Sequence, residues 1–250
     1  LIVFHSFILM NYTVLLVFSK DTSTNLGRLD YASLSQQTLM EMVVDTVENR
    51  ELITGSKESP KDISEWRGLT VEEDEVHDID WRIDGLSFKG RLNLEWLPPT
   101  VIGLNANNHN LLGTVAFSSL PSTLEDMNLG CNVLTGTVDL THLPEVMKSL
   151  YLHRNQFSGS LDLTCLPKSL NILVLALNSF SGSVDLSKLP QELDRLALDD
   201  NDITGTLDEG TLPYFMYQLN VSKTRIAGKV PKKTHRLKFL RFEDSNVEIV

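Results

Sequence analysis

The sequence predicts an α/β solenoid, in which short coils of chain stack along a parallel β-sheet and a helical segment caps the N-terminal end. The dipeptide Leu-Pro recurs six times at intervals of 23 residues, from Leu97 to Leu212. Seven glycines, from Gly90 to Gly228, recur with the same interval. Within each repeat, apolar residues at positions 8 and 10 alternate with other residues, as expected of a strand with one buried face. A fixed period of this length is typical of repeat architectures.

The composition is that of an ordinary soluble protein, with 250 residues, 42% hydrophobic residues, 22% charged residues and a net charge of −11. The length alone allows one large domain or two small ones, but the repeat indicates one elongated core over 74–250. The acidic balance argues against nucleic acid as a partner, since phosphate binding needs a basic face. Two cysteines are too few for a disulfide framework or a four-cysteine zinc module.

Residues 1–18 are apolar and contain no acidic or basic residue, which predicts a secretory signal peptide or a membrane anchor. The alternative is a misassigned start, with Met10 as the initiator and a shorter apolar core. Either a signal or an anchor favours a secreted or cell-surface protein, and an anchor implies membrane association. Residues 19–30 are polar and are expected to form a spacer.

Residues 31–73 are expected to form the helical cap. Apolar residues from Leu34 to Val47 lie mostly three or four positions apart, which predicts an amphipathic helix within 33–49. The Gly, Ser and Pro content of 54–62 predicts a loop. Tryptophans at 66 and 81 and the apolar residues between them suggest a compact apolar cap next to the first coil.

The repeat domain divides into coils at 74–96, 97–119, 120–142, 143–165, 166–188, 189–211, 212–234 and a partial coil at 235–250. The first coil fits without its Leu-Pro. In the last coil, Leu240 and Phe242 continue the pattern with a shift of two residues.

The shared pattern LPxxLxxLxLxxNxLxGxVDLxx resembles the leucine-rich repeat family, in the glycine-containing type found in plant receptor ectodomains and in secreted or surface protist proteins. The resemblance implies a right-handed leucine-rich-repeat solenoid with a concave parallel sheet that binds proteins or peptides. Two departures separate this chain from the plant type. Asp-Leu, as at Asp162, mostly replaces the Ile-Pro that follows the glycine, and the cap around Trp66 lacks paired cysteines.

Each repeated residue has an expected physical role. A buried asparagine at position 13 can satisfy backbone groups where the chain leaves the strand, with His109 and Thr224 in its place at the margins. Proline at position 2 suits entry to the convex side, and glycine at position 17 suits a tight corner with close packing between coils. The aspartate at position 20 is expected to cap a turn rather than to form a calcium ladder, which needs more carboxylates. The asparagines are Asn132, Asn155, Asn178 and Asn201.

One coil presents apolar residues at positions that should face outward on the concave sheet. Positions 7, 9, 11 and 12 carry mostly polar side chains, but the coil at 166–188 places Ile172, Val174 and Leu177 there. Exposed contiguous apolar surface usually marks an interaction site, and Tyr and Arg often anchor interfaces. The alternative is that another part of the chain covers this coil. The candidate partner-binding residues are Tyr151, His153, Arg154, Ile172, Val174, Leu177 and Ala197.

Other features suggest further roles. Asn220 begins a glycosylation sequon, and a glycan there would push a partner toward the middle coils; the sequon can equally stay unused. Stacking brings Cys131 near His153, but this is interpreted as coincidence, and Cys165 lies on another side of its coil. A basic C-terminal stretch either caps the last coil in solvent or contacts an anionic partner. Its residues are Lys223, Arg225, Lys229, Lys232, Lys233, Arg236, Lys238 and Arg241.

The predicted function is a non-enzymatic protein-interaction module, secreted or at the cell surface, that binds a protein or peptide on the concave face. The alternative is an intracellular leucine-rich-repeat scaffold or regulatory subunit of the same shape, in the cytoplasm. The sequence contains no phosphate-binding loop, nucleophile elbow or kinase signature. We therefore expect no catalytic residues, no metal and no cofactor.

Overall fold

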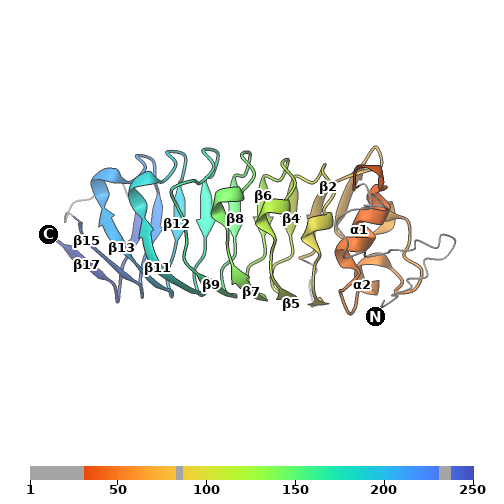
Figure 1. Ribbon diagram of the computed structural model, residues 1–250, viewed down its shortest axis with the longest axis horizontal. Helices are drawn as coiled ribbons and strands as arrows, with labels where there is room; N and C mark the ends of the chain where they lie inside the picture. The colour runs from red at the N-terminus through yellow and green to blue at the C-terminus, as the bar shows by residue number, and fades with distance from the viewer. Residues whose placement is uncertain (1–30, 83–86, 231–237) are drawn as a thin grey trace, which may run out of the picture.

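The computed structural model describes residues 31–82, 87–230 and 238–250. Coils of chain stack into an elongated body, with the helices α1 and α2 at one end and the strands β15 and β17 at the other (Figure 1). The predicted solenoid with a parallel sheet and an N-terminal helical cap is confirmed. The predicted leader at 1–18 and spacer at 19–30 lie outside the described residues.

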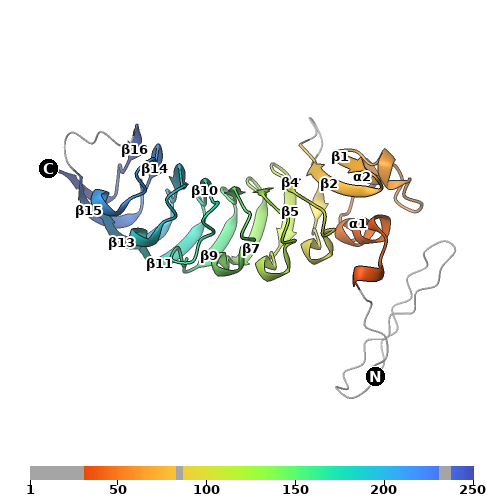
Figure 2. The same cartoon turned by 90° about the horizontal axis from the view of Figure 1, so that it is seen from above.

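The first sheet has nine strands and follows the inner side of the curved stack (Figure 2). All neighbouring strands are parallel except β1 and β2, which are antiparallel. Equivalent residues of neighbouring strands from β4 to β14 lie 23 residues apart, as the repeat predicts. The strands are β1 (Leu69–Glu72), β2 (Glu75–Asp80), β4 (Gly103–Asn105), β6 (Asp126–Asn128), β8 (Ser149–Tyr151), β10 (Ile172–Val174), β12 (Arg195–Ala197), β14 (Gln218–Asn220) and β16 (Phe239–Arg241).

Strand alternation places positions 8 and 10 in the core, as expected. Leu150 and Leu152 have no exposed surface, and the same holds for Leu173 and Leu175 in the next coil. Each of these side chains packs in one continuous apolar core that runs from the cap to the last coil. Burial of this kind contributes about 1.5–3 kcal/mol per large aliphatic side chain, and a single coil could not provide it alone.

A second sheet of eight parallel strands lies on the opposite side, and the sequence analysis did not predict it. The repeated glycine lies within its strands rather than at a corner. Gly136 has a φ of 91°, which favours glycine, and a Cβ there would lie 2.9 Å from Thr114 Cγ2 of the preceding coil. The expected close packing between coils is thus confirmed. The strands are β3 (Lys89–Gly90), β5 (Asn110–Gly113), β7 (Val133–Thr137), β9 (Gln156–Gly159), β11 (Ser179–Asp185), β13 (Asp202–Asp208), β15 (Arg225–Val230) and β17 (Asn246–Ile249).

Short 3-10 turns follow the second sheet, and the position-20 aspartate caps those at Leu140–His142, Leu186–Lys188 and Glu209–Thr211, as predicted. Asp139 Oδ1 accepts hydrogen bonds from the backbone N–H and the hydroxyl of Thr141 at 3.0 and 2.6 Å. Asp162 does the same for Thr164 at 2.9 and 2.6 Å, although no 3-10 turn is formed there. The turns in the coils are Leu94–Trp96, Phe117–Ser119, Leu140–His142, Leu186–Lys188 and Glu209–Thr211.

The cap is more elaborate than predicted. The expected helix within 33–49 is shorter, because α1 (Gln36–Val44) ends before Val47, which forms a β-bridge with Gly90. A second helix, α2 (Glu51–Thr54), ends at Gly55 in a left-handed conformation. Further 3-10 turns lie at Tyr31–Ser33 and Ile63–Glu65. The buried side chains of α1, Trp66 and Trp81 join the solenoid core, so the cap seals its first coil.

The first and last coils depart from the 23-residue interval. Asp78 pairs with Gly103, 25 residues away, so the first strand lies two residues earlier than the repeat places it. The 23-residue interval predicts Asp80 and Arg82 as outward strand residues of this coil, but the observed pairing makes them Asp78 and Asp80. At the other end, Leu219 pairs with Leu240 at an interval of 21 residues, which confirms the predicted shift.

Within the described part of the chain, none of the helices combines the length and the apolar character needed to cross a membrane.

Candidate interaction surface

The strand register brings the predicted apolar residues together on the concave face. Val174 of β10 lies between Tyr151 of β8 and Ala197 of β12, and Ile172 lies between Ser149 and Arg195. Tyr151, Ile172 and Val174 are half-buried, whereas Ala197 is 7% exposed and offers little surface of its own. We call Tyr151, His153, Ile172, Val174 and Leu177 the β10 patch.

The position-12 residues leave the strand in a left-handed backbone conformation. Arg154 and Leu177 have φ values of 54° and 56°, and Cys131 and Asp200 in neighbouring coils are similar. Leu177 is 37% exposed and Arg154 is also exposed. Both side chains therefore lie at the rim where the chain turns off the sheet, and the patch extends from the strand to this rim.

His153 lies over a space that a glycine provides. A Cβ at Gly130 would overlap the imidazole ring, so the neighbouring coil accommodates the ring only because residue 130 is glycine. His153 Nε2 contacts Cys131 Sγ at 3.7 Å, and the ring meets Tyr151 edge-on with the ring centroids 6.4 Å apart. Burial, with a smaller contribution from the Arg154 charge, lowers the pKa of His153 below its ordinary value. Both effects therefore favour the neutral form of the ring.

The predicted proximity of Cys131 to His153 is thus present. Cys131 and Cys165 are both free thiols. Among the described residues, no group of three or more His, Cys, Asp or Glu side chains could hold a metal ion. A thiol and one imidazole supply only two ligands, and a structural zinc site needs four.

Charged groups flank the β10 patch on both sides. On the N-terminal side, Lys148 Nζ pairs with Glu125 Oε2 at 2.5 Å and Ser149 Oγ donates to Asp126 Oδ1. On the C-terminal side, burial raises the pKa of Asp199 above its ordinary value. Arg195 has a side-chain Nε that is sealed from solvent and has no hydrogen-bond partner among the described residues. The apolar strip is therefore bordered by charge rather than by more apolar surface.

A group of exposed aromatic side chains at the C-terminal end was missed by the sequence analysis. Phe215 is 78% exposed and stacks edge-on with Tyr214 at 4.9 Å between ring centroids. Tyr217 and Phe239 form a second edge-on pair at 5.2 Å, and Lys238 Nζ lies 5.4 Å from the Tyr217 ring centroid. Aromatic residues at positions 3, 4 and 6 of one coil, where the preceding coil has Gln, Glu and Asp, were the available signal.

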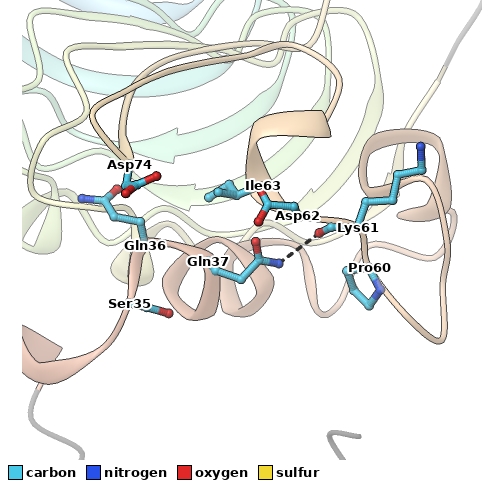
Figure 3. A pocket seen from close by; sticks show the side chains of 8 residues that line it. All are labelled: Ser35, Gln36, Gln37, Pro60, Lys61, Asp62, Ile63 and Asp74. Carbon is cyan, nitrogen blue, oxygen red and sulfur yellow. Dashed lines mark hydrogen bonds between the residues drawn. The ribbon is translucent and has the colours of Figure 1, made fainter.

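The cap carries an open hollow of about 450 Å³, but its polar groups hold the cap together (Figure 3). Gln37 Nε2 donates to the Lys61 carbonyl, and Gln36 Oε1 accepts from the Val76 N–H. Asp62 Oδ1 accepts from the Ser64 N–H. These bonds join α1 to the loop and to β2, so the hollow needs no ligand to explain its residues.

The glycosylation candidate lies within the first sheet. Asn220 is 8% exposed, and its side-chain oxygen accepts hydrogen bonds from the N–H and hydroxyl of Ser222 at 3.2 and 2.7 Å. Use of this sequon stays a prediction, and a glycan would have to replace this local arrangement.

The basic C-terminal stretch is partly neutralised. Lys223 pairs with Asp200 at 3.1 Å and Arg225 with Asp202 at 2.7 Å, both acids belonging to the preceding coil. The basic residues Lys232, Lys233 and Arg236 lie outside the described residues.

No protein-family model matches the sequence, and no curated protein is significantly similar to it. Among solved structures, the chain is similar to the leucine-rich-repeat ectodomain of the Arabidopsis thaliana receptor kinase GASSHO1/SCHENGEN3, in complex with CASPARIAN STRIP INTEGRITY FACTOR 2. The TM-score is 0.62 at 20% identity, over 85% of this chain and 30% of that one. The plant peptide hormone receptor RGFR1, in complex with RGF2, gives a TM-score of 0.53 at 22% identity, over 65% of this chain and 30% of that one.

A third structure, of Pollen Receptor Kinase 3, gives a TM-score of 0.53 at 20% identity and is covered almost completely, with 84% of this chain and 94% of that one. The chain spans only 30% of the length of each of the first two receptors. At these identities the likeness concerns the fold, which is that of a leucine-rich-repeat solenoid.

Proposed function

We propose that the protein is a non-enzymatic interaction module that binds a protein or peptide on its concave face, at the β10 patch. The observation that carries this proposal is the set of accessible apolar side chains in the middle of the concave sheet, next to coils whose outward positions are mostly polar. Val174 and Ile172 are half-buried on the outward side of β10, and Leu177 adds 37% exposure at the rim. Exposure of this apolar surface to water is unfavourable in free energy, and a partner that covers the surface would remove this cost.

The solved structures support the same kind of function. Two of them show plant receptors in complex with named ligands, RGF2 and CASPARIAN STRIP INTEGRITY FACTOR 2. A solenoid offers an extended curved surface for such contacts, and the outward positions can vary without loss of the core. We extend peptide or protein binding from those proteins to this chain as part of the proposal.

The test uses the full chain and a displayed library of random peptides. We expect peptides that are enriched on the wild-type chain to bind Val174→Asp and Tyr151→Ala at least about tenfold more weakly, since a buried aromatic or aliphatic anchor is typically worth this much. Ser183→Asp, on the outward face of the second sheet, is the matched control and should bind as the wild type does. Enriched peptides that bind Val174→Asp with full affinity would place the site elsewhere.

We propose further that the protein is secreted or at the cell surface. The apolar run at 1–18 supports export, as does the occurrence of the fold in the ectodomains of plant receptors. N-terminal sequencing of the native protein tests this, because an exported chain should lack the leader. A retained leader together with recovery in the cytosolic fraction would favour the intracellular scaffold or regulatory subunit instead.

A further inference from the structure

We infer that the β10 patch recognises an extended peptide in which apolar residues are flanked on both sides by carboxylates. This inference rests on the proposed function, because it specifies the chemistry of the ligand at the same patch. Two arginines support this inference, Arg195 and Arg154, which lie at opposite ends of β10.

Arg195 is the first residue of β12 and lies next to the start of β10. It is paired in register with Ile172, and its side chain is half-buried. Its Nε is sealed from solvent and lacks a hydrogen-bond partner among the described residues, and no ion pair is formed by its guanidinium there. A guanidinium stays charged at every physiological pH, and an unsatisfied buried donor is costly. Since Nε itself is sealed, a carboxylate of a ligand would accept two parallel hydrogen bonds from the terminal nitrogens of the guanidinium.

Arg154 follows β8 and lies beyond the other end of β10. Its backbone N–H donates to the Ala176 carbonyl, which fixes it beside Leu177, and its left-handed conformation turns the chain off the strand there. Its side chain is exposed and has no acidic partner among the described residues, whereas Lys148 of the same coil and Lys223, at the equivalent position three coils away, both have one. Its charge is one cause of the lowered pKa of His153, so its field reaches the patch.

The two arginines define a diagonal across β10. Five residue positions and two strand spacings separate them, which gives a span of at most roughly 19 Å, a distance that an extended peptide covers in about six residues. Between these ends the ligand would pass over Ile172, Val174 and Leu177. The acids that face the same surface lie off the diagonal. Asp126 is bonded to Ser149, and Asp199 follows β12 at the end opposite to Arg195.

The experiment uses the same displayed peptide library on the full chain. We expect the enriched peptides to carry two Asp or Glu residues about five to six positions apart with apolar residues between them. Replacing either acid by its amide should weaken binding about tenfold, as should raising the salt concentration. Arg195→Gln and Arg154→Gln should each remove the effect of one acid only, which a double-mutant cycle detects.

Two further variants separate a specific loss from misfolding. Arg195→Lys keeps the charge but not the planar fork, so it should bind with intermediate affinity. Arg225→Gln, whose partner Asp202 lies on the second sheet, should change nothing at the patch. Enriched peptides that depend on Val174 but show no preference for acids would overturn this inference and leave the proposed function standing. Enriched peptides that do not depend on Val174 would overturn both.

Discussion

Each central coil contains an asparagine that points inward and a strand residue that points outward a few positions before it, and the two behave in opposite ways. The inward position is the same in four successive coils, with Asn132, Asn155, Asn178 and Asn201. The outward position 9 changes in every one of them. It is occupied by Asn128, Tyr151, Val174 and Ala197.

The hydrogen bonds explain the difference. The Asn178 side chain donates to the carbonyls of Leu152, Leu175 and Ala176 at 3.0, 3.0 and 3.3 Å, and its oxygen accepts from the Phe157 N–H at 3.1 Å. Few other side chains offer donors and an acceptor in that geometry. Val174 makes no such bonds, so its replacement leaves the backbone satisfied. The inward column therefore determines whether the coils stack, and the outward column determines what binds to them.

The largest expected effect comes from Asn178→Ala. Removal of the amide takes the acceptor from the Phe157 N–H and one hydrogen bond from each of three carbonyls, which should lower the free energy of unfolding by about 1–3 kcal/mol. Denaturant unfolding followed by circular dichroism measures this.

Asn107→Ala is the matched control, because the Asn107 side chain faces outward, is half-buried and forms no hydrogen bond with the residues that the structure describes. It should change the free energy of unfolding by less than about 0.5 kcal/mol. Equal losses in the two variants would contradict the distinction between the inward and outward columns.

The inward column was predictable from sequence because each of its residues has one role in every coil. The replacement of asparagine in the outer coils was also predicted from the sequence. There His109 Nδ1 accepts from the Phe88 N–H, and Thr224 Oγ1 donates to the Val221 carbonyl. The second sheet was not predicted because a glycine in the middle of a segment normally weakens a strand. Here the neighbouring coils supply the strand's hydrogen bonds, and this information lies 21 residues away in the sequence.

The outward face was predictable only in outline. Alternation gave the direction of Val174 and Tyr151, but not the near-complete burial of Ala197 or the sealed Nε of Arg195. The burial of these groups depends on the way in which the longer side chains of neighbouring coils cover one another. Most of the aromatic group around Phe215 was missed because Tyr214, Phe215 and Tyr217 occupy positions 3, 4 and 6, which do not belong to the outward strand positions 7, 9, 11 and 12.

A smaller effect is expected from Gly130→Ala, which tests the outward face alone. The new methyl group would overlap the His153 ring, and the ring can move toward solvent without disturbing the backbone. The pKa of His153 should then rise toward its ordinary value, because its burial is the main cause of the lowering. An NMR titration of the imidazole measures the shift, and unfolding should change by less than about 1 kcal/mol.

The pH dependence of stability gives a second measurement on the same variant. In the wild type the folded pKa of His153 lies below its unfolded value of 6.5, so the unfolded chain takes up a proton first as the pH falls. The contribution of neutral His153 to the free energy of unfolding is therefore fully present above pH 6.5 and is lost as the pH falls toward the folded pKa. Gly130→Ala should reduce this loss. An unchanged titration in the variant would show that Gly130 does not determine the position of the ring.

The smallest effect is expected from Asp162→Asn, and it decides whether repetition or burial makes a column important. Asp139, Asp162 and Asp185 recur as regularly as the asparagines, but their carboxylates are exposed on the convex side. Hydrogen bonds from the hydroxyl and N–H of Thr164 lower the pKa of Asp162 below 3.8, so its contribution is present above 3.8 and is lost as the pH falls through the folded value. An asparagine keeps an acceptor for the turn. We therefore expect a thermal midpoint near that of the wild type at neutral pH and a weaker decline in acid.

A loss at neutral pH as large as that of Asn178→Ala would mean that repetition alone predicts structural importance. A small loss would assign that importance to buried hydrogen bonds, which only the structure distinguishes from exposed ones.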